Sequence, residues 1–240
     1  MWIGKVNASS CTQILIDRFN VTEIINTGIA GSLNKKVKLC DIVISDNVTY
    51  HDVRQAQMKN HFPFKEFFTT NEQLRELAIK AYENNVPQNY DYHIGRIVTG
   101  DTFVCDDDLK KKIITNYNPY CVEMEGAAIG HVAEINKIPF IIIRSISDNA
   151  DKEASINYKE FEGIASNNSA MLVLGMLELI SRLSWYKRFS SYLHKLCIIL
   201  GLYGVISIGR KPLYVFTPLN MSSTYFQQVI IIFGDNNNSW

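Results

Sequence analysis

Residues 121–151 constrain the fold of this chain more than any other stretch. They contain an apolar run, residues 138–146, which is followed by a turn-prone trio that includes Asp148. A run of this length is typical of a strand that is buried on both faces. The apolar residues before the run recur at helical spacing, so we predict a helix at 124–136 followed directly by a buried strand.

Acidic side chains flank both predicted elements. Glu123 and Glu125 lie at the start of the helix, and Asp148 ends the strand. In open α/β sheets the ligand crevice lies outside the carboxyl ends of the strands, so Asp148 occupies the place of a catalytic acid. Simpler explanations stay open, because an aspartate after a strand often forms a turn or caps a helix, and acids near a helix N-terminus complement its dipole.

Arg144 is the only charged residue inside the apolar run. An arginine is almost never fully buried unless it is paired, so we expect a carboxylate or a ligand anion beside it. The arginine and the acids together predict a polar site at the strand ends.

A run of small residues at 27–32 follows a predicted strand at 22–26. Such a run lets backbone N–H groups approach a ligand closely, although a plain tight turn has the same composition. The absence of G-x-G-x-x-G and of a following G-K-[ST] excludes a Rossmann fingerprint and a P-loop. His51 beside Asp52 is a further candidate, either as a catalytic dyad or as a structural hydrogen bond.

Helices and strands are predicted to alternate along the chain. Thr70 and Gln73 form a capping box that begins one helix, and Asp106 begins another. The other elements predicted are a helix from about 4 to 19, a strand pair or one long strand at 37–48, a strand at 93–98, an irregular loop at 54–68 and a helix at 157–183. This alternation predicts a three-layer α/β fold with a mostly parallel sheet.

The composition is that of an ordinary globular protein, with 240 residues of which 47% are hydrophobic. Lys and Arg number 24, as do Asp and Glu, so the net charge of zero gives no case for nucleic acid or an anionic membrane as partner. The 5 cysteines show no C-x-x-C and no metal-ligand spacing with histidine, which predicts reduced thiols in the cytoplasm. We expect neither a metal nor a cofactor.

Several collinear motifs resemble the 5′-methylthioadenosine/S-adenosylhomocysteine nucleosidases. They are I-I-N-T-G-I-A-G-S-L at 24–33, D-I-V-I-S-D-N-V-T-Y-H-D at 41–52, I-V-T-G-D-T-F-V at 97–104, V-E-M-E-G-A-A-I-G-H-V at 122–132 and P-F-I-I-I-R-S-I-S-D-N-A-D at 139–151. The resemblance extends from about 3 to 183. It implies an α/β/α sandwich of the nucleoside phosphorylase type, a homodimer, and hydrolysis of the N-glycosidic bond of S-adenosylhomocysteine and 5′-methylthioadenosine with release of adenine.

The resemblance also implies roles around the ribose. Asp148 matches the general acid that protonates the adenine N7, which needs a raised pKa. Glu125 matches the carboxylate that hydrogen-bonds the ribose hydroxyls, and Met124 matches the residue that packs on the sugar. Arg144 matches the arginine near the attacking water.

Further matches lie around the purine and the alkylthio group. Phe103 resembles the residue that stacks on adenine, and Val104 resembles the one that contacts adenine through its backbone. Ala30 and Gly31 resemble the small residues beside the purine. Tyr158 stands where the family usually has a phenylalanine against the 5′-alkylthio group.

Three departures from the family pattern predict weakened or absent activity. The match begins after the family's first strand, so the chain is expected to be N-terminally truncated and to lack the glutamate that positions the water. Ile29 stands in place of a serine, and Met58 in place of a phenylalanine that a partner subunit contributes. A catalytically impaired nucleoside-binding remnant and a purine nucleoside phosphorylase are the alternatives, although the strand at 22–26 lacks the arginine that holds phosphate in phosphorylases.

Two regions are expected from composition. Residues 1–183 form the predicted catalytic domain, and residues 184–240 form an aromatic and aliphatic tail of unknown role. The longest apolar run of the tail, 196–209, is too short and too interrupted by glycine to span a bilayer, so we expect no membrane partner.

Overall fold

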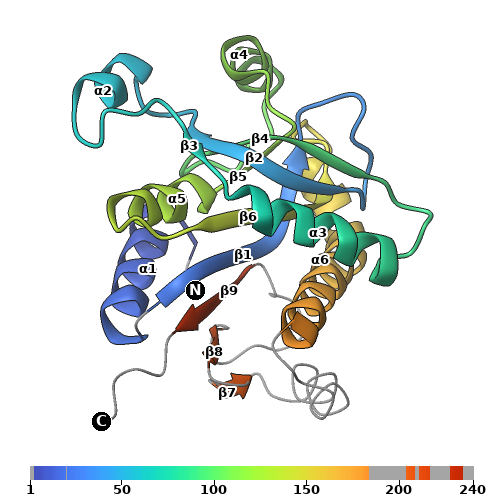
Figure 1. The fold of residues 1–240 in the computed structure, drawn as a ribbon. Helices are drawn as coiled ribbons and strands as arrows, with labels where there is room; N and C mark the ends of the chain where they lie inside the picture. The colour runs from blue at the N-terminus through green and yellow to red at the C-terminus, as the bar shows by residue number, and fades with distance from the viewer. Residues whose placement is uncertain (1–2, 20, 184–203, 209–210, 217–227, 235–240) are drawn as a thin grey trace.

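This computed structural model describes residues 3–19, 21–183, 204–208, 211–216 and 228–234 (Figure 1). The elements are α1 (Lys5–Phe19), β1 (Val21–Ser32), β2 (Ile42–Tyr50), α2 (Gln55–Asn60), β3 (Phe68–Thr69), α3 (Glu72–Asn85), β4 (Tyr92–Thr99), α4 (Asp107–Tyr117), β5 (Cys121–Glu123), α5 (Gly126–Ile135), β6 (Phe140–Asp148), α6 (Ala154–Leu183), β7 (Gly204–Ile208), β8 (Lys211–Phe216) and β9 (Gln228–Gly234). The predicted alternation of strands and helices is therefore present.

Five strands of the sheet close on themselves. β2 pairs with β4, β4 with β5, β5 with β1, β1 with β6, and β6 again with β2. The pairs β1–β6, β2–β4 and β4–β5 are parallel, whereas β1–β5 and β2–β6 are antiparallel. The sheet is thus mixed, which corrects the prediction of a mostly parallel one. Two consecutive strands can run parallel only when a long crossover, usually a helix, joins them. A short loop joins β1 to β2, so β2 runs opposite to β1 and therefore opposite to β6, which is parallel to β1.

Helices cover the sheet on two sides. Figure 1 shows α1 and α5 on one side and α3 and α6 on the other. β6 lies between them and is buried along its whole length, as its apolar run predicts. Successive side chains of a strand point to opposite faces, so Ile142 joins the apolar cluster of α5 while Ile141 and Ile143 join that of α3 and α6.

Two local signals differ from the sequence-based expectation. α3 is capped by Asn71, whose side chain accepts a hydrogen bond from Leu74 N at 3.0 Å, whereas the hydroxyl of Thr70 donates to Ser45 O. The small residues at 27–32 continue strand β1 and do not form a loop, because they pair with β6 and β5. The helix predicted from the acids at its start is present as α4, and the structure shows that Asp106 caps it.

The edge of β1 that faces away from β6 is covered by β9. The two strands pair antiparallel from Val21↔Gly234 to Gly28↔Gln228, and β8 and β7 extend the sheet beyond β9. Part of the predicted tail therefore belongs to the same sheet as the site described below. Most of the apolar run at 196–209 lies outside the described residues, and the division at 183 stays a prediction.

The described part of the chain contains one helix, residues 154–180 of α6, that is long and apolar enough to cross a membrane. Of its apolar window 44% is buried inside the molecule. A single helix of this kind is weak evidence, because core helices of soluble proteins meet the same criterion.

Candidate active site

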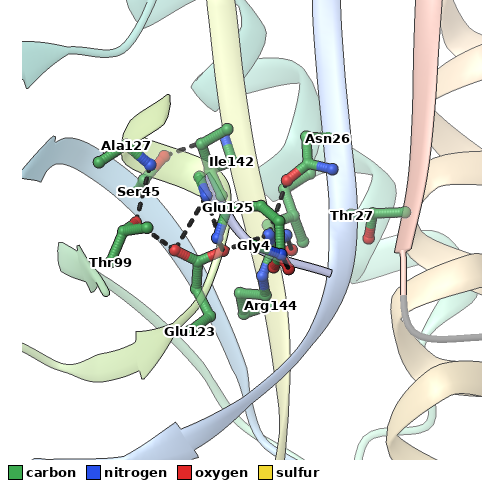
Figure 2. A network of polar contacts seen from close by, with 12 residues as sticks. Gly4, Asn26, Thr27, Ser45, Thr99, Glu123, Glu125, Ala127, Ile142 and Arg144 are labelled. Carbon is green, nitrogen blue, oxygen red and sulfur yellow. Dashed lines mark hydrogen bonds and ion pairs between the residues drawn. The ribbon is translucent and has the colours of Figure 1, made fainter. Parts of the chain in front are cut away.

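Arg144 lies at the centre of a buried polar network (Figure 2). Its side chain is 0% exposed, and its Nη2 donates to Glu123 Oε2 at 2.6 Å and to Asn26 Oδ1 at 2.7 Å. Its Nη1 donates to the carbonyl of Ile143 at 2.8 Å. The carboxylate expected beside a buried arginine is therefore present, and it is supplied by the end of β5.

Glu123 is held by several donors at the start of α5. Its carboxylate accepts hydrogen bonds from the N–H groups of Glu125 at 3.0 Å and Gly126 at 2.7 Å, and from the hydroxyl of Thr99. Backbone donors at a helix N-terminus and the guanidinium of Arg144 all favour a negative charge. The sequence-based alternative of an acid that complements the helix dipole thus applies to Glu123.

Glu125 has a different environment although it is only two residues away. It is buried, and Gly4 N donates to its Oε1 at 2.8 Å. Burial and the nearby charge of Glu123 raise the pKa of Glu125 to about 7, and the Gly4 N–H and Arg144 offset this only in part. Near neutral pH its carboxyl group can therefore exist in both protonation states, and it can bond to hydroxyl groups as acceptor or donor.

Asp148 ends β6 and is also buried. Ser147 Oγ donates to its Oδ2 at 2.9 Å, and Ala150 N donates to its Oδ1 at 2.8 Å. Burial raises the pKa of Asp148 even though both hydrogen bonds lower it. The turn-forming and the acid interpretations therefore both apply, because the bond to Ala150 N closes a local turn while burial favours the protonated form.

Ala30 and Gly31 adjoin Asp148 through a bulge between β1 and β6. Ala30 pairs with Ile146 and Gly31 with Asp148, so one residue of β6 is left over between them. A Cβ atom at Gly31 would lie 2.7 Å from Asp148 Oδ1. Glycine is therefore required for the close approach of this carboxylate to β1.

The remaining residues matched to the family are Phe103, Tyr158, Val104 and Met124. The ring of Phe103 is 42% exposed and meets the ring of Tyr158 edge-on, with centroids 6.2 Å apart. Val104 is buried in an apolar cluster with Ala150, in the turn that follows Asp148. Met124 is half-buried between Glu123 and Glu125.

The similarity of the sequence to known proteins identifies the family. The family model of the phosphorylase superfamily matches residues 2–178. The 5′-methylthioadenosine/S-adenosylhomocysteine nucleosidase of Treponema pallidum is 37% identical over 207 residues, which cover 75% of this chain and 77% of that protein. The chain belongs to this nucleosidase family. The resemblance predicted from the motifs is confirmed.

Two solved nucleosidases share the fold. The enzyme from Colwellia psychrerythraea in complex with adenine has a TM-score of 0.69 and 40% identity, and the match covers 73% of this chain and 74% of that one. The enzyme from Neisseria meningitidis in complex with methylthio-immucillin-A has a TM-score of 0.68 and 35% identity, with 73% and 77% covered. The nucleoside phosphorylase type of α/β fold is thus confirmed.

His51 and Asp52 were a candidate catalytic dyad in the sequence, but they do not form one in the structure. Asp52 Oδ2 accepts instead from Lys5 Nζ at 2.6 Å and from Asp101 N at 3.0 Å. The Nε2 of His51 is buried and has no hydrogen-bond partner among the described residues. Asp52 is held by Lys5 and Asp101, and not by a structural hydrogen bond from His51, which was the alternative to a dyad.

The sequence did not predict three residues that contact the charged groups of the nucleosidase site. They are Asn26, which contacts Arg144, Thr99, which contacts Glu123, and Gly4, which contacts Glu125. Asn26 carries a usable signal, since it interrupts an apolar strand as Arg144 does. Thr99 and Gly4 carry none, because a hydroxyl at a strand end and a glycine before a helix are common in any α/β protein.

We predict that Glu125→Gln changes the pH dependence of stability of this nucleosidase. The pKa of Glu125 rises from an ordinary value of 4.5 to about 7 on folding, so the folded state binds more protons than the unfolded state between these values. The contribution of Glu125 to stability is therefore fully present below pH 4.5, falls as the pH rises to about 7 and then levels off. Urea unfolding from pH 4 to 9 should show this fall in the wild type and a smaller one in Glu125→Gln. An equal fall in both proteins would contradict the assignment.

Proposed function

We propose that the chain hydrolyses the N-glycosidic bond of 5′-methylthioadenosine and S-adenosylhomocysteine, releasing adenine and the thioribose product. The observation that carries the proposal is the buried Asp148 against Gly31, in a chain 37% identical to a nucleosidase of this specificity. The adenine bound to the similar Colwellia enzyme supports a purine nucleoside as the substrate class.

The proposed reaction uses Asp148 as general acid. Its burial keeps the carboxyl group protonated to higher pH than usual, so it can donate a proton to N7 of the adenine. The C1′–N9 bond then breaks with its electron pair moving to the purine, and the ribose gains oxocarbenium character. A water molecule forms the new bond to C1′ and releases its proton to the solvent, from which the Asp148 carboxylate takes up a proton again, so one water is consumed and no net proton is gained or lost. Glu125, placed at the start of α5, bonds to the ribose hydroxyls.

The network around Arg144 favours water over phosphate as the nucleophile. Its guanidinium is already neutralised by Glu123 and held by Asn26. Its Nε is buried without a partner among the described residues, which leaves one N–H able to donate to a small oxygen nucleophile. A phosphate dianion would need further positive charge at this position.

We further propose that the protein is cytoplasmic and homodimeric. The loop after α2 exposes Phe62, Phe64 and Phe67, which are 68%, 65% and 44% accessible. Exposed aromatic side chains close together are typical of protein interfaces. Sedimentation equilibrium should give twice the chain mass, and Phe62→Ser with Phe64→Ser should reduce it toward the monomer.

The function is tested by adenine release from 5′-methylthioadenosine by the purified chain, with and without added phosphate. We expect release at the same rate in both conditions, with free thioribose as the second product. A requirement for phosphate would identify a phosphorylase. Binding of the nucleoside without release, measured by calorimetry on the folded protein, would identify a binding protein.

A further inference from the structure

The start of α1 lies directly on the Glu125 carboxylate. Gly4 N donates to Glu125 Oε1, 2.8 Å away, as Figure 2 shows. The next residue, Lys5, donates its backbone N–H to Asp101 Oδ1, also at 2.8 Å. Gly4 has a φ of +98°, a conformation that favours glycine, and a Cβ there would lie 3.1 Å from Asp101 Oδ1. Two successive N–H groups therefore contact two different acids.

The side chain of Lys5 joins the same segment to two further loops. Its Nζ lies 2.6 Å from Asp52 Oδ2 and 3.5 Å from Asp101 Oδ2. Asp101 N donates to Asp52 Oδ2 at 3.0 Å, which closes the group. The Lys5 and Asp52 side chains are only 21% and 28% exposed. We call Lys5, Asp52 and Asp101 the Lys5 cluster.

The Lys5 cluster connects both halves of the proposed site. Asp52 lies just after β2, and Asp101 lies in the loop after β4, two residues before Phe103. Through Gly4 the cluster also reaches Glu125 at the start of α5. Glu125, the proposed ribose-binding carboxylate, and Phe103, the proposed adenine-stacking residue, are thus both connected to the Lys5 cluster.

We propose that the Lys5 cluster is a positioning device that keeps Gly4 N–H on Glu125 and fixes the loop that carries Phe103. The proposal rests on the proposed function for the roles of these two residues. Lys5 acts through Glu125 and Phe103, so it is a positioning residue and not a catalytic one.

The charges around Glu125 give this device a measurable consequence. The groups that face Glu125 are the carboxylate of Glu123 on β5, the N–H of Gly4 before α1, the guanidinium of Arg144 on β6 and the backbone N–H of Met124. The first raises the pKa of Glu125, and the other three lower it. Loss of the Gly4 bond therefore raises the pKa of Glu125 further.

Asp52 keeps the device intact at neutral pH. Burial tends to raise the pKa of Asp52, but the hydrogen bonds from Lys5 and from Asp101 N outweigh it and lower the pKa below its usual range. The Asp52 carboxylate therefore stays ionised, and the ion pair with Lys5 persists over the pH range in which Glu125 titrates.

Lys5→Met tests the proposal, with Lys5→Arg as the conservative variant. We expect Lys5→Met to lower kcat/KM about ten- to a hundredfold, as misplaced site groups do. The acid limb of its pH profile should move to higher pH, and Lys5→Arg should restore both. Lys65→Met is the matched control, because it breaks an ion pair of equal length, Lys65 to Glu134 at 2.6 Å, outside the site. A loss of kcat/KM without a shifted limb would overturn the proposal.

A second measurement separates this inference from the proposed function. The Glu125 carboxyl carbon is titrated by ¹³C NMR in the unligated wild type, Lys5→Met and Lys65→Met, with Glu125→Gln to assign the signal. We expect a higher pKa in Lys5→Met alone. An unchanged pKa there would overturn the inference whether or not the wild type releases adenine, whereas a wild type without adenine release would contradict only the proposed function.

Discussion

Asp148→Asn is expected to lower kcat for adenine release by about 10²–10⁴-fold, the usual contribution of a general acid. The amide has nearly the same shape and can still accept the hydrogen bond from Ala150 N, so the turn after β6 should be retained. It cannot transfer a proton to the departing purine. Steady-state kinetics of adenine release, together with circular dichroism to verify folding, measure the effect.

The matched control for this variant is Asp107→Asn in the first turn of α4. Asp107 loses the same charge but lies on the surface, opposite Lys152 at 3.7 Å. We expect its kcat to stay within about twofold, since exposed ion pairs contribute little. If folded Asp148→Asn retained kcat within tenfold of the wild type, another group would have to protonate the purine.

The elements that the sequence predicted well are those whose signals are local. The apolar run that became β6 and the acids at the start of α4 each carry their information within a few residues. The end of β1 was mispredicted, because small residues are typical of loops. Its partners on β6 and β5 lie about a hundred residues away and could not be inferred from the residues at 27–32. The closed ring of strands could not be predicted for the same reason, because it depends on pairs between strands that lie far apart in the sequence.

The candidate site shows the same limit. A buried arginine predicted a carboxylate partner, but both Glu123 and Glu125 satisfied that prediction equally. Only the structure separates the charged acid that holds Arg144 from the acid with a raised pKa. The Lys5 cluster could not be predicted, since its contacts join residues 47 and 96 positions apart in the chain.

Glu123→Ala is expected to destabilise the protein by about 3–5 kcal/mol, because it leaves the fully buried Arg144 without its counter-charge. The variant also removes the acceptor for two backbone N–H groups at the start of α5 and for the hydroxyl of Thr99. Urea denaturation at pH 7 gives the difference in free energy of unfolding. Glu134→Ala, which breaks the exposed ion pair with Lys65, should cost less than about 1 kcal/mol.

The double variant Glu123→Ala with Arg144→Met distinguishes an unpaired charge from a general loss of packing. If the cost of Glu123→Ala comes mainly from the stranded guanidinium, removing that charge should recover part of the stability. If packing dominates, the two losses should add, and the double variant should be less stable than either single one. Recovery of stability without recovery of adenine release would show that the buried pair is kept for the site it organises and not for the stability of the fold.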